Sequence, residues 1–264
     1  MKKFLSLFLI LILLSSCSEY EKAIKSEDVA AKVNVATKMY DAGKYSKALR
    51  LLEQIAPSYK GKPDAEKVFY MYAQSYYKTQ QFYSAGYQFD SFASSYPKSD
   101  KREEAAFLSA KCYTTLSPRF SLDQKDTDKG IDKLQAFIDN YPNSQYLPDA
   151  NKAMKELKFK LEKKAYETAK QYNTISDFKS ALIAFDNFIS DFPGTTFKED
   201  ALFYKYDSAY KLAINSIPEK MQERLINAKT AYFNLNKFTQ SSKHKEKADM
   251  MLATIDKELQ KFSK

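Results

Sequence analysis

Apolar residues recur along most of the chain at intervals of three and four, the spacing that places them on one face of an α-helix. The run of Leu134, Phe137, Ile138 and Tyr141 is one clear example. Residues 219–238 and 243–262 also read as helices. Only five glycines occur among 264 residues, which argues against a β-rich fold because tight hairpin turns depend on glycine. The pattern therefore predicts an all-α protein.

Four prolines divide the chain into units that repeat the same marks. Each proline is followed seven residues later by an acidic residue and then by alanine: Pro57 with Asp64 and Ala65, Pro97 with Glu104 and Ala105, Pro142 with Asp149 and Ala150, and Pro193 with Asp200 and Ala201. Proline cannot continue a helix interior, so each is expected to close a helix. An acid in the first turn of the next helix complements its dipole. The prolines are 40, 45 and 51 residues apart, and such a unit holds two helices.

A second pattern pairs the helices into hairpins. An alanine is followed nine residues later by an aromatic residue and three residues after that by another alanine, as in Ala36/Tyr45/Ala48, Ala73/Phe82/Ala85 and Ala169/Phe178/Ala181. The third unit departs from it, with Thr127 and Gly130 in the last two places. The pattern resembles the tetratricopeptide repeat, in which small residues let two helices pack closely. The resemblance implies an α-solenoid of about five helical hairpins over residues 27–264, with an atypical last hairpin after Pro218.

The amino terminus has the pattern of an export signal. Two lysines precede the apolar run 4–14, which is followed by Ser15, Ser16 and Cys17. The run is shorter than the roughly 20 apolar residues that span a bilayer. Leu14 to Cys17 resembles a lipobox, which implies that residues 1–16 are a signal peptide and that Cys17 carries a diacylglycerol. Residues 17–26 are then a lipidated tether. An ordinary secretory leader or a short membrane anchor are the alternatives.

Charge and composition narrow the class of protein. The formal net charge is +9, and removal of the leader leaves about +7. Lysine and glutamate are interspersed rather than clustered, as on a solvated helical face, so no nucleic-acid partner is expected. The second cysteine, Cys112, lies in an apolar series and is expected to be a buried small hydrophobe.

Residues for catalysis are sparse. The single histidine, His244, has no cysteine or histidine at metal-ligand spacing, and there is no glycine-rich phosphate loop. A Ser-His-Asp triad would have to use this histidine. The sequence therefore predicts a protein that is not an enzyme and that has no cofactor and no metal site.

Two segments carry a more specific resemblance. They are residues 137–146, Phe-Ile-Asp-Asn-Tyr-Pro-Asn-Ser-Gln-Tyr, and residues 117–124, Ser-Pro-Arg-Phe-Ser-Leu-Asp-Gln. Both resemble the BamD family, the outer-membrane lipoproteins of the β-barrel assembly (BAM) machinery. The resemblance implies a lipid anchor at the periplasmic face of the outer membrane and contact with a BamA-like barrel insertase. It also implies a role in receiving unfolded outer-membrane proteins for insertion into the membrane.

Two other functions stay open. One is a different envelope repeat lipoprotein that coordinates cell-wall or division proteins. The other is a solute-capturing lipoprotein that partners an outer-membrane transporter. Ser18, rather than aspartate, follows Cys17, which favours the outer membrane over retention at the inner membrane.

Candidate partner-binding residues lie on the first helix of each hairpin. Counting from the alanines gives Tyr40 in the first unit, Lys67, Tyr70, Gln74 and Tyr77 in the second, and Lys163, Tyr166 and Lys170 in the fourth. Eleven of the 28 residues 69–96 are aromatic, and tyrosine is favoured at protein interfaces. The hypothesis is a groove for an extended aromatic-rich peptide such as a barrel strand. The alternative is that these rings pack the core. The helices of 219–262 are the candidate dock for a folded partner.

Overall fold

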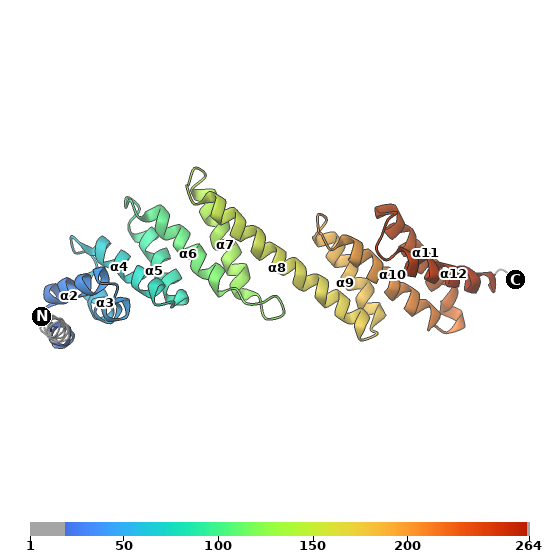
Figure 1. Ribbon diagram of the computed structural model, residues 1–264, viewed down its shortest axis with the longest axis horizontal. Coiled ribbons are helices and arrows are strands. Elements are labelled where there is room, and N and C mark those ends of the chain that lie inside the picture. Colours follow the sequence, from blue (N-terminus) through green and yellow to red (C-terminus); the bar gives the residue numbers. More distant parts are fainter. Residues whose placement is uncertain (1–18, 263–264) are drawn as a thin grey trace, which may run out of the picture. The chain divides into compact units, whose positions relative to one another are not determined.

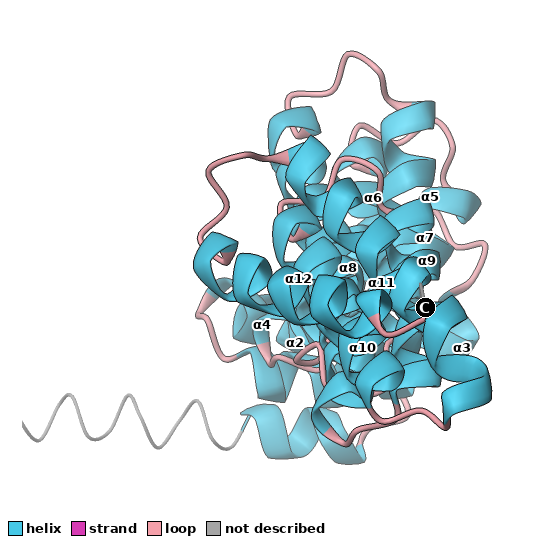
Figure 2. Cartoon of the chain, turned by 90° about the vertical axis from the view of Figure 1, so that its right-hand side faces the viewer, coloured by secondary structure: helices cyan, strands magenta, loops and turns pink. Residues whose placement is uncertain are grey.

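The computed structural model describes residues 19–262. Within that range the backbone forms helices joined by short loops and turns, with no β-strand (Figure 2). The all-α prediction is confirmed. The expected signal peptide and the lipidation site Cys17 lie outside the described residues. No helix in the described range is both long and apolar enough to cross a bilayer.

The helices divide into two compact units, with the boundary between Leu157 and Lys158 inside α8. Figure 1 shows the order of the elements along the chain. The first unit contains α2 (Val29–Asp41), α3 (Tyr45–Tyr59), α4 (Ala65–Lys78), α5 (Phe82–Ser95), α6 (Arg102–Leu116), α7 (Lys125–Asn140) and the start of α8 (Leu147–Thr174). The second unit contains the rest of α8 and then α9 (Phe178–Asp191), α10 (Lys198–Ile214), α11 (Pro218–Phe238) and α12 (Lys245–Gln260). Consecutive helices pair into five hairpins, from α2/α3 to α10/α11, and α12 packs on the last pair.

Alanine makes the close contact within the regular hairpins, as the sequence pattern predicts. All six alanines of the pattern are fully buried: Ala36, Ala48, Ala73, Ala85, Ala169 and Ala181. Because the alanine side chain has only one carbon, the two helix backbones can approach closely and still pack without a cavity. The tetratricopeptide-like pairing is therefore built on these contacts.

The third hairpin replaces the aromatic residue by a hydrogen-bonded group. Thr127 is fully buried, and its hydroxyl bonds to Ser117 Oγ at 2.6 Å and to Gln124 Oε1 at 2.7 Å. These bonds fasten the loop that is inserted between α6 and α7. Thr127, where the repeat pattern has an aromatic residue, thus supplies hydrogen bonds to buried polar groups of that loop. Without a partner these groups would destabilise the fold.

One expected helix end differs. Pro97, Pro142 and Pro193 follow the ends of α5, α7 and α9, but Pro57 lies inside α3, which continues to Tyr59. Proline lacks only its own backbone donor, so the last two residues of α3 still adopt helical geometry after it. The prediction that Pro57 closes its helix is therefore wrong.

Each unit has cores of its own. In the first unit one core includes Leu52, Phe89 and Phe92, and a second includes Phe107, Phe137 and Leu157. In the second unit the cores are built around Phe185 and Phe188 and around Tyr206 and Leu225.

Helical packing begins before residue 27, where the repeat domain was expected to start. Residues 19–25, expected to be a tether, are helical, and Tyr20 and Ala23 are buried in the first core. The helical region of residues 19–262 therefore extends further toward the amino terminus than expected and is divided into two units.

Candidate partner-binding surfaces

The first candidate surface lies in the first unit, on the first helices of its hairpins, α2, α4 and α6. Tyr70 of α4 is at its centre. The amide nitrogen of Gln74 donates to the Tyr70 hydroxyl at 2.9 Å, and Tyr70 also hydrogen bonds to Glu104 of α6. Lys101 pairs with Glu104 at 2.9 Å and holds its ammonium 5.6 Å from the centre of the Tyr70 ring. Polar groups from two helices thus surround one half-buried ring.

The tyrosines of this surface are held in their neutral form. Burial, with the nearby Glu104 carboxylate, raises the pKa of Tyr70 above its usual value. Burial and the neighbouring Tyr45 ring raise the pKa of Tyr40 in the same direction. A neutral phenol both donates and accepts hydrogen bonds. The Tyr70 hydroxyl already accepts from Gln74 and donates to Glu104, so the Tyr40 hydroxyl is the one suited to the polar groups of a peptide backbone.

The residues predicted in the first unit take different roles. Tyr40 and Tyr70 are half-buried and lie near each other, while Lys67 is exposed. Gln74 is 8% exposed, so it orients Tyr70 rather than facing solvent. Tyr77 packs edge-on against Phe82 and Phe89 at 5.7 and 6.1 Å between ring centres, which makes it mainly a packing residue of the second hairpin.

The residues predicted in the second unit require a correction. Tyr166 is only 4% exposed and stacks on Phe197, with 4.8 Å between ring centres. A ring that is buried in this way belongs to the core and cannot offer its face to a partner. Lys170 lies 5.1 Å from the ring centre of Tyr204, and Lys163 is half-buried. Only these two lysines of the predicted set reach the surface of this unit.

A groove between α6, α7 and α8 was not foreseen from the sequence. It encloses about 340 Å³ within the first unit. Phe107 and Leu134 form its apolar lining, and charged residues from α6 and α8 stand around it: Lys111, Asp149, Lys152 and Glu156. The sequence signal is the spacing of Asp149, Lys152 and Glu156 by three and four residues, which places them on one face of α8.

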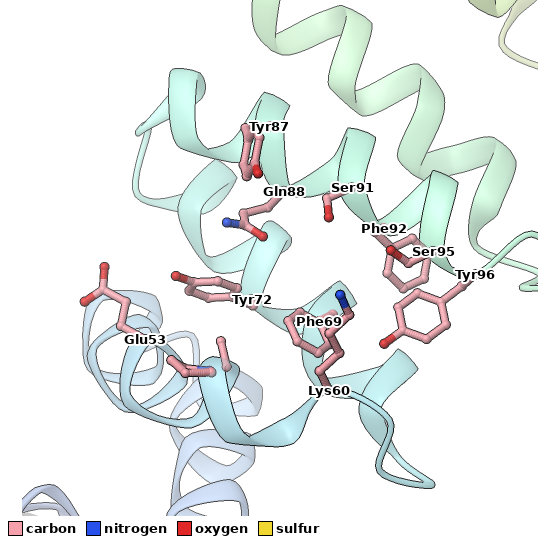
Figure 3. Close-up of a pocket in the computed structure, with 12 residues that line it drawn as sticks. Glu53, Lys60, Phe69, Tyr72, Tyr87, Gln88, Ser91, Phe92, Ser95 and Tyr96 are labelled. Atoms are coloured by element: carbon pink, nitrogen blue, oxygen red, sulfur yellow. The ribbon is translucent and has the colours of Figure 1, made fainter.

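A second pocket, also unforeseen, lies between α3 and α5 over α4 (Figure 3). It encloses about 380 Å³. Phe69, Tyr72, Phe92 and Tyr96 provide aromatic walls, and Glu53 and Lys60 are its charged residues. The many aromatic residues in 69–96 indicated that this region binds a partner. They did not indicate which face of the helices does so, because aromatic residues lie on more than one face of α4 and α5.

No metal centre is evident in the part of the chain that the structure describes, since residues 19–262 contain no group of three or more His, Cys, Asp or Glu placed to hold an ion. The His244 ring instead hydrogen bonds to Asp200 at 2.7 Å and stacks on Phe203. Cys112 is buried as predicted, and burial raises the pKa of its thiol to about 12. A thiol with so high a pKa is not a nucleophile at neutral pH.

Comparison with known proteins places these surfaces in a family. The family YfiO, described as outer membrane lipoprotein, matches residues 28–225. The outer membrane protein assembly factor BamD of Haemophilus influenzae is 21% identical over 231 residues, which cover 84% of this chain and 88% of that protein. BamD of Pasteurella multocida is also 21% identical, over 83% of this chain and 88% of its own length.

Solved tetratricopeptide structures also match. One is the TPR2AB domain of yeast Sti1 in its pHSP90 complex, at 15% identity and a TM-score of 0.37, covering 86% of this chain and 98% of that one. The family match is the decisive finding because it spans most of the chain, including all three surfaces described in the first unit. The chain belongs to the YfiO family of outer membrane lipoproteins.

Proposed function

We propose that this chain is a lipid-anchored periplasmic scaffold of the outer-membrane β-barrel assembly machinery. It binds unfolded barrel proteins and a BamA-like insertase, and it catalyses no reaction. The observation that carries the proposal is the family match over residues 28–225, together with two relatives that are outer membrane protein assembly factors.

The Tyr40 and Tyr70 surface supports the binding of an unfolded barrel protein. Strands of membrane barrels carry aromatic residues and, before they pair, unsatisfied backbone donors and acceptors. The half-buried rings of Tyr40 and Tyr70 offer aromatic surface, and the neutral Tyr40 hydroxyl offers hydrogen bonds. Lys67 adds an exposed cation beside them on α4. An extended strand with alternating side chains suits such a surface.

The second unit supports the docking of the folded insertase. Ile226 and Phe233 are 51% and 53% exposed and lie seven residues apart on α11, so they share one face of that helix. Large apolar side chains that stay exposed on one face are typical of protein interfaces. We assign this face of α11 to the insertase because a folded partner needs a rigid surface rather than a groove.

Site-specific photo-crosslinking tests the assignment of the barrel substrate. A photoreactive residue at exposed Lys67 is expected to crosslink to newly exported barrel proteins in cells. The matched control is exposed Lys179 on α9, a second helix of a hairpin in the other unit, which is expected to give little crosslinking. Equal crosslinking from both positions would contradict the assignment.

Purification in mild detergent, followed by mass spectrometry, separates this function from the two alternatives. A large barrel protein with periplasmic domains is expected to copurify. Cell-wall enzymes would instead indicate a coordinating lipoprotein, and an outer-membrane transporter would indicate a solute-capturing one. Either of the last two results, without the barrel protein, would contradict the proposal.

A further inference from the structure

The regular hairpins carry an acidic residue at one equivalent position. It lies five residues after the buried alanine of each second helix: Glu53 after Ala48, Asp90 after Ala85 and Asp186 after Ala181. Asp90 of α5 forms an ion pair with Lys133 of α7 at 2.8 Å. This pair bridges two consecutive second helices, so the molecule itself shows that a lysine side chain fits between them.

The corresponding bridge between α3 and α5 is missing. Lys133 lies three residues after Gly130, and the residue three after the equivalent Ala85 is Gln88, which has no charge. Glu53 and Gln88 both line the pocket of about 380 Å³ between these helices (Figure 3). Among the described residues no cation pairs with Glu53. A carboxylate thus stands at an open pocket in the position where its counterpart Asp90 holds a lysine.

Hydrogen bonds hold this carboxylate in place. The Tyr76 hydroxyl donates to Glu53 Oε1 at 2.9 Å, and the hydroxyls of Tyr72 and Tyr76 lie 3.0 Å apart. Tyr72 and Tyr76 are only 8% and 9% exposed. The carboxylate is therefore oriented by a buried pair of phenols, and such preorganisation lowers the cost of binding a ligand.

Aromatic rings surround the rest of the pocket. Figure 3 shows the Tyr72 ring between Glu53 on one side and Gln88 on the other, with Phe69 further along the wall. Tyr87, which is 64% exposed, stands at the rim. Such rings attract a cation electrostatically and cover its aliphatic stem. Elsewhere in this unit Lys129 already binds in this way, with its ammonium 4.4 Å from the Tyr113 ring centre.

We propose that this pocket binds an arginine or lysine side chain of an extended segment of a partner protein. The charged end pairs with Glu53 in the place that Lys133 occupies beside Asp90, and the stem lies on Tyr72 and Phe69. Lys60 at the opposite end, beside Phe69 and Tyr96 (Figure 3), repels a second cation and favours an acidic residue there. The pocket is lined by α3, α4 and α5, and so is separate from the surface formed by Tyr40, Tyr70 and Glu104.

Calorimetric titration of the full chain in mild detergent tests the proposal. The probe is the peptide acetyl-Arg-Phe-Asp-amide, and its matched control carries citrulline, the neutral isostere of arginine. The arginine peptide is expected to bind at least about tenfold more tightly, which corresponds to one charge-assisted hydrogen bond. Hydrogen exchange is expected to slow in α3 and α5 on binding. Equal affinity for both peptides, no binding of either, or protection confined to α2 and α6 would overturn the proposal.

Two variants and a control assign the effect to Glu53. Glu53→Gln keeps an acceptor for Tyr76 but removes the charge, and it is expected to weaken the arginine peptide about tenfold. Gln88→Lys supplies the cation that Lys133 supplies in the next hairpin, so it is expected to abolish binding by filling the site. Exposed Glu219→Gln in the other unit is the control and is expected to bind as the unchanged chain does. Unchanged binding in Glu53→Gln would overturn the proposal. This test does not depend on Gln88→Lys, so it holds even if that variant folds poorly.

Discussion

Ser144 donates a hydrogen bond of 2.6 Å to Glu103 and so ties the turn before α8 to the first turn of α6. The same serine accepts a hydrogen bond from the Tyr146 backbone at 3.0 Å. The arrangement recurs: Ser99 bonds to Glu66, Thr195 to Glu162 and Ser242 to Glu199. In the first three cases the hydroxyl follows the repeat proline by two residues. A hydroxyl thus links each of these four turns to a helix one hairpin earlier.

Removal of this link should lower stability. Ser144 is 8% exposed, so Ser144→Ala leaves the Glu103 carboxylate without its donor in a partly dry site. The expected loss is about 2 kcal/mol in the free energy of unfolding, measured by urea denaturation. Ser94→Ala, at an exposed position of α5, is the control and should change it by less than about 0.5 kcal/mol. Similar losses in the two variants would show that the link does not stabilise the fold.

The stability of the second unit should depend on the ionisation of Asp207. This residue is 2% exposed; Asn173 donates to it at 2.9 Å, and Lys211 pairs with it at 2.6 Å. Burial opposes ionisation, but the bonds from Lys211 and Asn173 outweigh it and hold the pKa of Asp207 below its usual value. A lowered pKa in the folded state stabilises the protein above the unfolded-state pKa of about 3.9, and this stabilisation is lost as pH falls through the folded-state value.

Asp207→Asn should therefore be less stable at pH 7, by about 2 kcal/mol, and should lose less of its stability between pH 4 and pH 2 than the unchanged chain. Thermal unfolding across this pH range measures both effects. Asp132→Asn, at an exposed position of α7, is the control and should follow the unchanged chain. A steeper acid loss in Asp207→Asn would contradict the sign of the pKa shift.

A left-handed residue occurs at the same place in three hairpins, two residues before the second helix begins. Gly43, Gln80 and Ser176 have φ values of 71°, 61° and 66° before α3, α5 and α9. An L-residue in this conformation costs roughly 1 kcal/mol more than glycine does. Gln80→Gly should therefore raise the free energy of unfolding by about 1 kcal/mol, and Gly43→Ala should lower it by about as much.

Urea denaturation checks this pair. A Cβ atom added at Gly43 meets no heavy atom within 4 Å, so a loss in Gly43→Ala reports backbone strain rather than a clash. A gain of stability in Gly43→Ala would contradict the explanation.

The sequence predicted the hairpins because the features that form them are local. Ala73, Phe82 and Ala85 lie within 13 residues of each other, and helix pairing follows from such spacing. The turn links were missed for the opposite reason, since Ser144 and Glu103 are 41 positions apart. The one sequence signal that could have revealed these links is the hydroxyl that recurs two residues after Pro97, Pro142 and Pro193.

The candidate surfaces were predicted less well than the fold. Tyr70 and Tyr166 occupy equivalent positions, three residues before Ala73 and Ala169. Yet Tyr70 is half-buried, whereas Tyr166 is covered by Phe197. Helical spacing gives the face of a helix but not what the next helix places over it. The pocket between α3 and α5 escaped prediction in the same way, because residues of three helices line it together.

Lipidation at Cys17 gives a test outside the described residues. Metabolic labelling with a palmitate analogue is expected to mark the unchanged chain and Cys112→Ser but not Cys17→Ser. The thiol of Cys112 is buried, so it serves as the internal control. Label in Cys17→Ser would place the acyl group elsewhere, and an unlabelled but intact chain would contradict the lipid anchor.

Depletion of the protein, followed by quantitative mass spectrometry of the outer membrane, tests whether the chain acts in the assembly of barrel proteins. Many unrelated barrel proteins are expected to fall together, while lipoproteins without a barrel keep their levels. Renewed expression of the chain is expected to restore the barrel proteins. Barrel proteins that hold their normal levels throughout depletion would contradict this role.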